Sequence, residues 1–212
     1  KLKLSFSEKL SLTKRPTLNA EAYDLYLRGQ DQLYRLTKSS VEYAIQLFEK
    51  AIELDSRYAS AYAGCSSAYG QMYQLIARED RYRELAQELS FKALMYDNNL
   101  SEAYRAMGLS YFLWGTLDEA TASCSKAIEI DPTKIEYHIE LSNLYIKSGL
   151  KTKAIGVLNN ALNHHPDSQR INDAIAAAGE GKLSAAAAGE TAKQGGAHQK
   201  VTKENAAKAL EK

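Results

Sequence analysis

The chain has 212 residues, of which 45% are hydrophobic and 25% are charged, and its formal net charge at pH 7 is +1. This nearly neutral charge offers no broad electrostatic attraction to nucleic acid or to anionic lipid, so we do not expect nucleic acid as a partner. No apolar run approaches the roughly 20 residues that span a bilayer, so membrane insertion is not expected either. The apolar content is sufficient for one extended core.

Residues 1–18 precede the first recurring pattern, and we expect them to be a linker from an upstream domain. The chain begins at Lys1 and its first methionine is Met72, which favours a processed or excised piece of a longer protein. The first predicted helix pair covers residues 19–58, with about three residues added between its helices. Its recurring positions are Leu25, Gly29, Ala44, Phe48 and Ala51.

The second predicted helix pair, residues 59–100, is the longest unit. It has 42 residues, eight more than the units that follow it. We expect the extra residues to lengthen its first helix through Met72, Tyr73 and Ile76 by about two turns, at about 3.6 residues each. Its recurring positions are Tyr62, Cys65, Ser66, Tyr69, Ala86 and Ala93.

The third predicted pair, residues 101–134, shows why the pattern specifies packed helices. Large residues recur at three- and four-residue spacing in its first helix, and small residues do so in its second helix. Gly108 lies where the two helices must approach closely. Gly115 interrupts the helical pattern between them, and Pro132 ends the second helix. The recurring residues are Tyr104, Met107 and Tyr111, then Ala120, Cys124 and Ala127.

Residues 135–168 repeat this register, and residues 169–178 are expected to form a short capping helix. Alanines mark the same position of successive units at intervals of 42, 34 and 34 residues, and 34 is the period of a tetratricopeptide repeat. Residues 101–134 resemble the tetratricopeptide pattern W-x2-L-G-x2-Y…A-x3-F…A…P, with Tyr for Trp and Cys for Phe. The resemblance implies an all-α fold, a right-handed α-solenoid of four helix pairs plus a capping helix over residues 19–178. The alanines are Ala51, Ala93, Ala127 and Ala161.

Residues 179–212 differ in composition from the repeats. Ala, Gly, Lys, Glu, Gln and Thr dominate, and the only large aliphatic residues are Leu183, Val201 and Leu210. Such a segment cannot bury enough apolar surface to offset its chain entropy. We therefore expect a low-complexity, mobile tail.

The sequence shows no convincing site for catalysis, a cofactor or a metal. The adjacent histidines His164 and His165 lie in a helix-ending turn with no further ligands at metal-binding spacing. Cys65 and Cys124 fall on predicted inner helix faces, where a free cysteine acts as a small hydrophobe and suggests a reducing compartment such as the cytoplasm. No phosphate-binding glycine loop, nucleophile elbow or paired carboxylates appear. This portion is expected not to be an enzyme and to need no cofactor.

The resemblance also implies where a partner would bind. In tetratricopeptide proteins the first helix of each pair lines the concave face of the superhelix, where extended or helical peptides are held. A peptide with apolar anchors suits the predicted groove, with Arg105, Asn143 and Lys147 fixing its polar ends. The alternative is that these side chains only pack against adjacent helices and hold no ligand. The predicted groove residues are Tyr23, Tyr26, Gln30, Arg105, Leu109, Phe112, Ile139, Asn143 and Lys147.

One function of the family can be compared with the residues directly. Tetratricopeptide proteins that bind chaperone tails use a clamp of Lys, Asn and Arg for the terminal carboxylate. The corresponding positions of the third and fourth units here are Arg105, Leu109 and Glu140. Because a glutamate repels a carboxylate, this clamp is absent.

The N-terminal half carries a narrower resemblance. The phrase RPTLNAEAYDLYLRGQDQL, leading into AIQLFEKAIELDSRYASAYAGCSSAY, resembles the start of the repeat region in bacterial adenylate or guanylate cyclase-like and TolB-like signalling proteins. This resemblance implies an alternative function, as a regulatory or self-associating domain whose catalytic domain lies before residue 1. A homo-oligomer would then use the long second unit, through Met72, Tyr73 and Ile76, or the exposed end helix.

Overall fold

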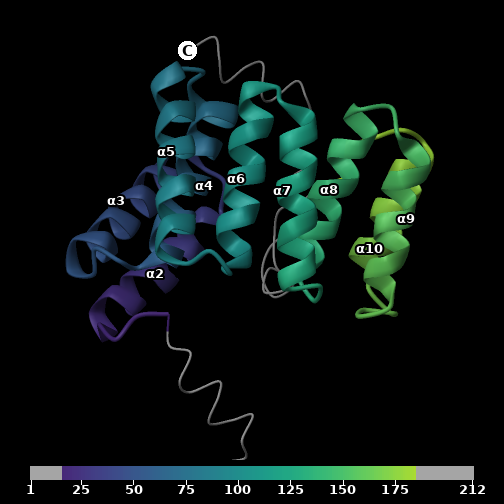
Figure 1. Cartoon of the computed structure of the whole chain (residues 1–212). Coiled ribbons are helices and arrows are strands. Elements are labelled where there is room, and N and C mark those ends of the chain that lie inside the picture. Colours follow the sequence, from purple (N-terminus) through teal and green to yellow (C-terminus); the bar gives the residue numbers. More distant parts are fainter. Residues whose placement is uncertain (1–15, 185–212) are drawn as a thin grey trace, which may run out of the picture.

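The computed structural model describes residues 16–184, and within this range every regular element is helical (Figure 1). This confirms the all-α prediction. Most of the expected linker and tail lies outside the described residues. The elements are α2 (Ala20–Leu33), α3 (Lys38–Leu54), α4 (Ala59–Gln71), the π-helical turn η1 (Met72–Ile76), α5 (Asp80–Tyr96), α6 (Ser101–Trp114), α7 (Leu117–Ile130), α8 (Ile135–Lys147), α9 (Lys151–Leu162) and α10 (Gln169–Gly179).

The helices stack as successive pairs into a right-handed solenoid (Figure 1). Within a pair, α2 packs on α3, α4 on α5, α6 on α7, and α8 on α9. The second helix of each pair also contacts the first helix of the next pair, so the core is continuous along the stack. The first helices therefore form one layer of the molecule and the second helices form the other.

Small residues let the paired helices approach closely. The repeating alanines Ala51, Ala93, Ala127 and Ala161 are all at most 1% exposed. A Cβ atom on Gly108 of α6 would lie 2.6 Å from Cys124 Sγ of α7, a distance that side-chain carbons do not adopt. The backbones of α6 and α7 can therefore meet only because position 108 has no side chain.

A recurring aspartate shapes the turns between pairs. Asp55, Asp97 and Asp131 directly follow α3, α5 and α7, and each carboxylate accepts a hydrogen bond from the backbone N–H two residues later, at 2.9–3.1 Å. An aspartate in this position mimics a backbone turn and competes with further helix. The same sequence feature thus ends three second helices in the same way.

The second unit is longer than its neighbours, but its extra residues are distributed differently from the prediction. The first helix continues from α4 through η1, which ends at Ile76, where Ala77 N donates to Met72 O at 2.9 Å. Helix α5 has 17 residues, whereas α7 has 14. The prediction that all the extra residues lengthen the first helix by two turns is therefore wrong, because part of the added length lies in the second helix.

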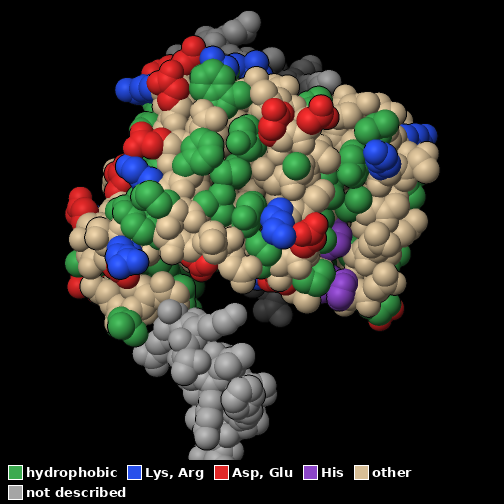
Figure 2. Space-filling view, viewed as in Figure 1, with side chains coloured by type: hydrophobic (Ala, Val, Ile, Leu, Met, Phe, Trp, Pro, Cys, Tyr) green, Lys and Arg blue, Asp and Glu red, His purple; other side chains and the backbone are tan. Residues whose placement is uncertain are grey.

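Helix α10 covers the end of the stack. It runs over Gln169–Gly179 and buries Ile171, Ala174 and Ala178 against α8 and α9. Its apolar face closes the core that the last pair would otherwise expose. Within residues 16–184, no helix combines the length and the apolarity needed to cross a membrane. On the face shown in Figure 2, acidic and basic side chains are interspersed and neither sign forms a continuous field.

We expect Ala127→Leu to lower the free energy of unfolding by about 1 to 3 kcal/mol, because a larger side chain at a buried helix contact forces backbone shifts. Ala122→Leu is the matched control, since Ala122 lies on the same helix but is exposed. Urea denaturation of the two variants measures the effect. Equal shifts in both variants would contradict the placement of α7 in the stack.

Candidate functional site

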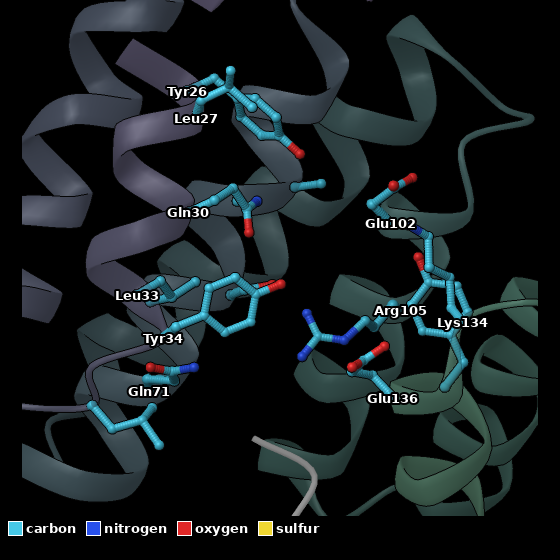
Figure 3. Close-up of a pocket in the computed structure, with 15 residues that line it drawn as sticks. Tyr26, Leu27, Gln30, Leu33, Tyr34, Gln71, Glu102, Arg105, Lys134 and Glu136 are labelled. Atoms are coloured by element: carbon cyan, nitrogen blue, oxygen red, sulfur yellow. The ribbon is translucent and has the colours of Figure 1, made fainter. Parts of the chain in front are cut away.

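The first helices of all four pairs line one cavity of about 250 Å³, which we call the first cavity (Figure 3). It opens on the concave side of the stack, and its wall combines aromatic, apolar and charged side chains. The lining residues are Tyr26, Leu27, Gln30, Leu33, Tyr34, Leu36, Ala63, Gly64, Ser67, Gln71, Glu102, Arg105, Lys134, Glu136 and Tyr137.

The floor of the first cavity is made of small residues of α4 for a packing reason. Phe48 of α3 is fully buried behind α4, and a Cβ atom on Gly64 would lie 2.6 Å from its ring. The α4 backbone can pass over this ring only at a glycine. With Ala63 and Ser67 beside it, Gly64 leaves open space in front of α4.

Tyr26 of α2 and Tyr34, which directly follows α2, form one wall of the first cavity (Figure 3). The Tyr26 ring is held by Phe48 and Tyr58, with ring centroids 5.9 and 5.3 Å away. Burial, with Glu102 nearby, raises the pKa of Tyr26 far above the ordinary phenol range, so its hydroxyl stays protonated and can donate a hydrogen bond. Tyr34 is 52% exposed, and its hydroxyl points across the cavity toward Arg105 (Figure 3).

Arg105 of α6 lies on the opposite wall, paired with Glu140 of α8. Arg105 Nε lies 3.0 Å from both carboxylate oxygens, and Nη2 lies 2.6 Å from Oε1. The two side chains are only 29% and 21% exposed, so water screens the pair weakly. The charge of Glu140 raises the pKa of Arg105 even further above its ordinary value. Glu140, which excluded a carboxylate clamp in the sequence, thus neutralises the groove arginine.

A second ion pair ties the fourth unit to the capping helix. Arg170 Nη1 of α10 donates to Glu136 Oε1 of α8 at 2.9 Å. Burial alone would raise the pKa of Glu136, but hydrogen bonds from Arg170 and the backbone, with the charges of Arg170 and Arg105, outweigh it. The pKa of Glu136 therefore lies below its ordinary value of 4.5, and the carboxylate stays charged beside the cavity.

A second cavity of about 230 Å³ lies beside the first and is lined mainly by α6 and α8. Lys147 Nζ lies 4.2 Å from the centroid of the Phe112 ring, a cation–π contact that fixes both side chains. Leu109 packs against α4 at Gly70, where a Cβ atom would lie 2.7 Å from Leu109 Cδ2. The lining residues are Gln74, Gly108, Leu109, Phe112, Cys124, Glu140, Asn143, Leu144, Lys147, Leu183 and Ser184.

The structure brings most of the predicted groove residues to these two cavities. Tyr26, Gln30 and Arg105 line the first cavity. Four further residues line the second cavity, namely Leu109, Phe112, Asn143 and Lys147. Tyr23 is exposed on α2 and lines neither cavity.

Ile139 requires a correction. It is 1% exposed and packs against Leu158 and Ile171 in the last core cluster, so it is not a groove residue. The reason is that α10 covers this face of α8. In the two preceding units the equivalent face of the first helix lies toward the first cavity. The cap thus turns a predicted groove position into a core position.

The surface predicted for self-association is also corrected. Met72 is 5% exposed and belongs to the core cluster around Phe48, against which Ile76 packs as well. Tyr73 is half-buried beside Arg83, whose guanidinium carbon lies 5.7 Å from the ring centroid. The turn η1 directs Met72 and Ile76 inward against α3 and α5, so these residues form no exposed patch.

Sequence reasoning missed Leu183 and Ser184, which line the second cavity although they were placed in the tail. Their composition gave no signal, because the turn that returns them to the stack depends on tertiary contacts. The two cysteines are free and buried, as expected for packing residues. Burial, with the charge of Glu140 nearby, raises the pKa of Cys124 to about 12. Residues 16–184 contain no cluster of three or more metal-ligating side chains.

Comparisons with known proteins agree with this geometry. Residues 115–178 match the family model described as tetratricopeptide repeat. No curated protein is similar enough to count as a match. A thermophilic tetratricopeptide protein from Thermus thermophilus is 24% identical, with a TM-score of 0.67 over 80% of this chain and 86% of that chain. MamA from Desulfovibrio magneticus, from residue 41 to its end, is 18% identical, with a TM-score of 0.51 over 77% of this chain and 83% of that chain.

At these identities the solved structures show the fold alone. The family model matches residues 115–178, and the solved structures show that residues 16–184 have the fold of a tetratricopeptide-repeat solenoid. The finer resemblance of the N-terminal half to bacterial signalling regulators stays a prediction. It concerns residues before and within the first two units, whereas the family match begins at residue 115.

We expect a double-mutant cycle on Arg105→Ala and Glu140→Ala to give a coupling energy of about 1 to 3 kcal/mol, because the pair is bidentate and mostly shielded from water. The control cycle uses Arg35 and Asp31, which lie 2.9 Å apart but are 60% and 66% exposed. That pair should couple by less than about 0.5 kcal/mol. Urea denaturation measures both cycles, and equal coupling would refute the shielding argument.

Stability should also depend on pH through Glu136. Because its folded pKa is lowered, the ionised carboxylate stabilises the fold at pH values above 4.5, and this contribution disappears as the pH falls through the lowered pKa. Glu136→Gln should therefore be less stable than wild type at neutral pH, and the difference should shrink toward about pH 3. The exposed Glu53→Gln is the control. A difference that grows on acidification would contradict the assignment.

Proposed function

We propose that this chain is a non-catalytic protein-interaction module that binds a peptide or a partner helix along its concave groove. The observation that carries the proposal is the rim of the first cavity. Three large apolar side chains there, Leu27, Tyr34 and Leu36, are exposed beside polar groups that converge on the same space. Apolar side chains gathered around a concavity are typical of a contact surface.

The polar lining of the first cavity supports a ligand that donates hydrogen bonds. Gln71 lines the cavity, and its Oε1 atom is buried without a hydrogen-bond partner among the described residues. Buried polar atoms are rarely left unpaired. A backbone N–H of a bound peptide would donate a hydrogen bond to this acceptor. The protonated Tyr26 hydroxyl would donate a hydrogen bond to a peptide carbonyl.

The charges of the groove favour a ligand held mainly by apolar and uncharged polar contacts. Of the four charged residues that line the first cavity, Arg105 and Glu136 are each engaged in an ion pair within the chain, whereas Glu102 and Lys134 have opposite charges and form no ion pair among the described residues. A ligand charge placed at Arg105 or Glu136 would compete with these pairs. Binding should therefore depend weakly on salt concentration.

The size of the first cavity favours a peptide over an enclosed small molecule. The cavity of about 250 Å³ is smaller than the roughly 300–1,000 Å³ typical of pockets that enclose a small molecule. The second cavity lies on the other side of the Arg105–Glu140 pair, since Arg105 lines the first cavity and Glu140 lines the second. Two cavities placed in this way suit one or two anchor side chains with main chain between them.

The alternative function, a self-associating regulatory domain of a signalling enzyme, has no comparable support. Its predicted surface residues Met72 and Ile76 pack in the core. The concave groove is therefore the better candidate for the functional surface.

We expect Tyr34→Ala to weaken peptide binding about tenfold or more, or about 1.4 kcal/mol, because an exposed tyrosine beside a concave contact surface is a frequent anchor. Peptides would be selected from a random displayed library on the full chain and their affinities then measured by titration. Tyr43→Ala is the control, since Tyr43 is a similarly exposed tyrosine on α3, outside both cavities. Selected peptides that bind both variants as tightly as wild type would refute the groove as the binding site.

A further inference from the structure

The chain turns back toward the concave groove directly after α10. Gly181 adopts the left-handed conformation, with φ at 72°. Its N–H donates to Ala178 O at 3.0 Å, and Lys182 N donates to Ala177 O at 2.8 Å. This is the hydrogen-bond pattern of a Schellman turn, which ends a helix and reverses the chain. The residues after α10 are thereby directed toward the rest of the fold instead of continuing the helix axis.

Asn143 of α8 then holds the main chain of Ser184. Asn143 Nδ2 donates to Ser184 O, and Ser184 N donates to Asn143 Oδ1, both at 2.8 Å. Asn143 was predicted to fix the polar end of a peptide, and here it engages both backbone groups of one residue. Such a contact recognises the main chain and does not depend on the side chain of the residue that is held. A segment of this chain therefore already occupies a position suited to a bound peptide.

The segment that follows Ser184 starts beside the second cavity. Leu183 and Ser184 form part of its lining, opposite Leu109 and Phe112 of α6. The cavity still holds about 230 Å³ of space at this point. The next four residues, Ala185 to Ala188, are alanines, whose small side chains fit a cavity of that size.

Chain length permits this segment to lie along the groove. Residues 185–212 follow Ser184, and an extended chain advances by about 3.3 Å per residue, so even the first few residues can span the second cavity. Because the segment is covalently attached next to the cavity, its effective concentration is on the order of millimolar. Weak contacts are then sufficient to keep it bound.

We propose that the C-terminal segment beginning at Ala185 occupies the second cavity in cis and acts as an internal competitor for the groove. The competition rests on the function proposed above, whereas the occupancy itself does not. A partner peptide that reaches past the Arg105–Glu140 pair has to displace this segment from Phe112 and Lys147. Asn143 is the contact that both occupants share.

Hydrogen exchange on the full chain tests occupancy without any partner. The amides of residues 184–188 should exchange about tenfold or more slowly than those of a free peptide with the same sequence. Asn143→Ala should remove most of this protection. Asn159→Ala, an exposed asparagine on α9, is the matched control and should leave it unchanged. Exchange in the wild type at the free-peptide rate would overturn the proposal.

Disulfide trapping provides a second test that leaves Asn143 intact. In the full chain, Lys147→Cys combined with Ala186→Cys should form an intramolecular disulfide about tenfold faster than Lys147→Cys combined with Ala206→Cys. Equal rates, or linked dimers alone, would overturn occupancy in cis. Neither test uses a partner, so their failure leaves the proposed peptide binding standing. Failure of the Tyr34→Ala experiment would likewise leave the occupancy standing.

Discussion

The close approach of paired helices is the constraint on which the rest of this structure depends. At Gly108 any side-chain carbon would collide with Cys124, and Ala127, on the same helix as Cys124, is 1% exposed. Because the two helices of a unit meet through such small residues, they pack closely together. Successive pairs then stack with curvature. That curvature creates the concave face. The cavities, and the first helices that line them, follow from this packing.

Two ion pairs within the chain neutralise charges of the groove. Arg105 contacts Glu140 across two units, and Glu136 contacts Arg170 of the capping helix. These pairs join α6 to α8 and α8 to α10, so they help to fix the spacing of the three helices. The tyrosines and the unpaired amide oxygen of Gln71 are among the groups available to a ligand. The same residues thus contribute to both the shape of the groove and its selectivity.

We propose different occupants for the two cavities. The first cavity has an exposed apolar rim with Tyr34 at its edge, which suits an incoming partner. The second cavity is bordered by the chain's own Leu183 and Ser184. Since the Arg105–Glu140 pair lies between them, a ligand long enough to use both would meet the C-terminal segment. Partner affinity would then depend on how firmly Asn143 holds that segment.

The sequence by itself determined the repeat, the helix pairs and most of the groove, because the 34-residue period fixes which face of each helix is small, buried or concave. Tyr26, Arg105 and Phe112 could be placed on the groove from their register alone. Only the tertiary structure decided the rest. Ile139 is buried because α10 covers it, Met72 is buried because η1 turns it inward, and Arg105 is neutralised by a residue 35 positions away. Contacts between distant segments, such as that of Asn143 with Ser184, depend on how units stack and end, which a local pattern does not encode.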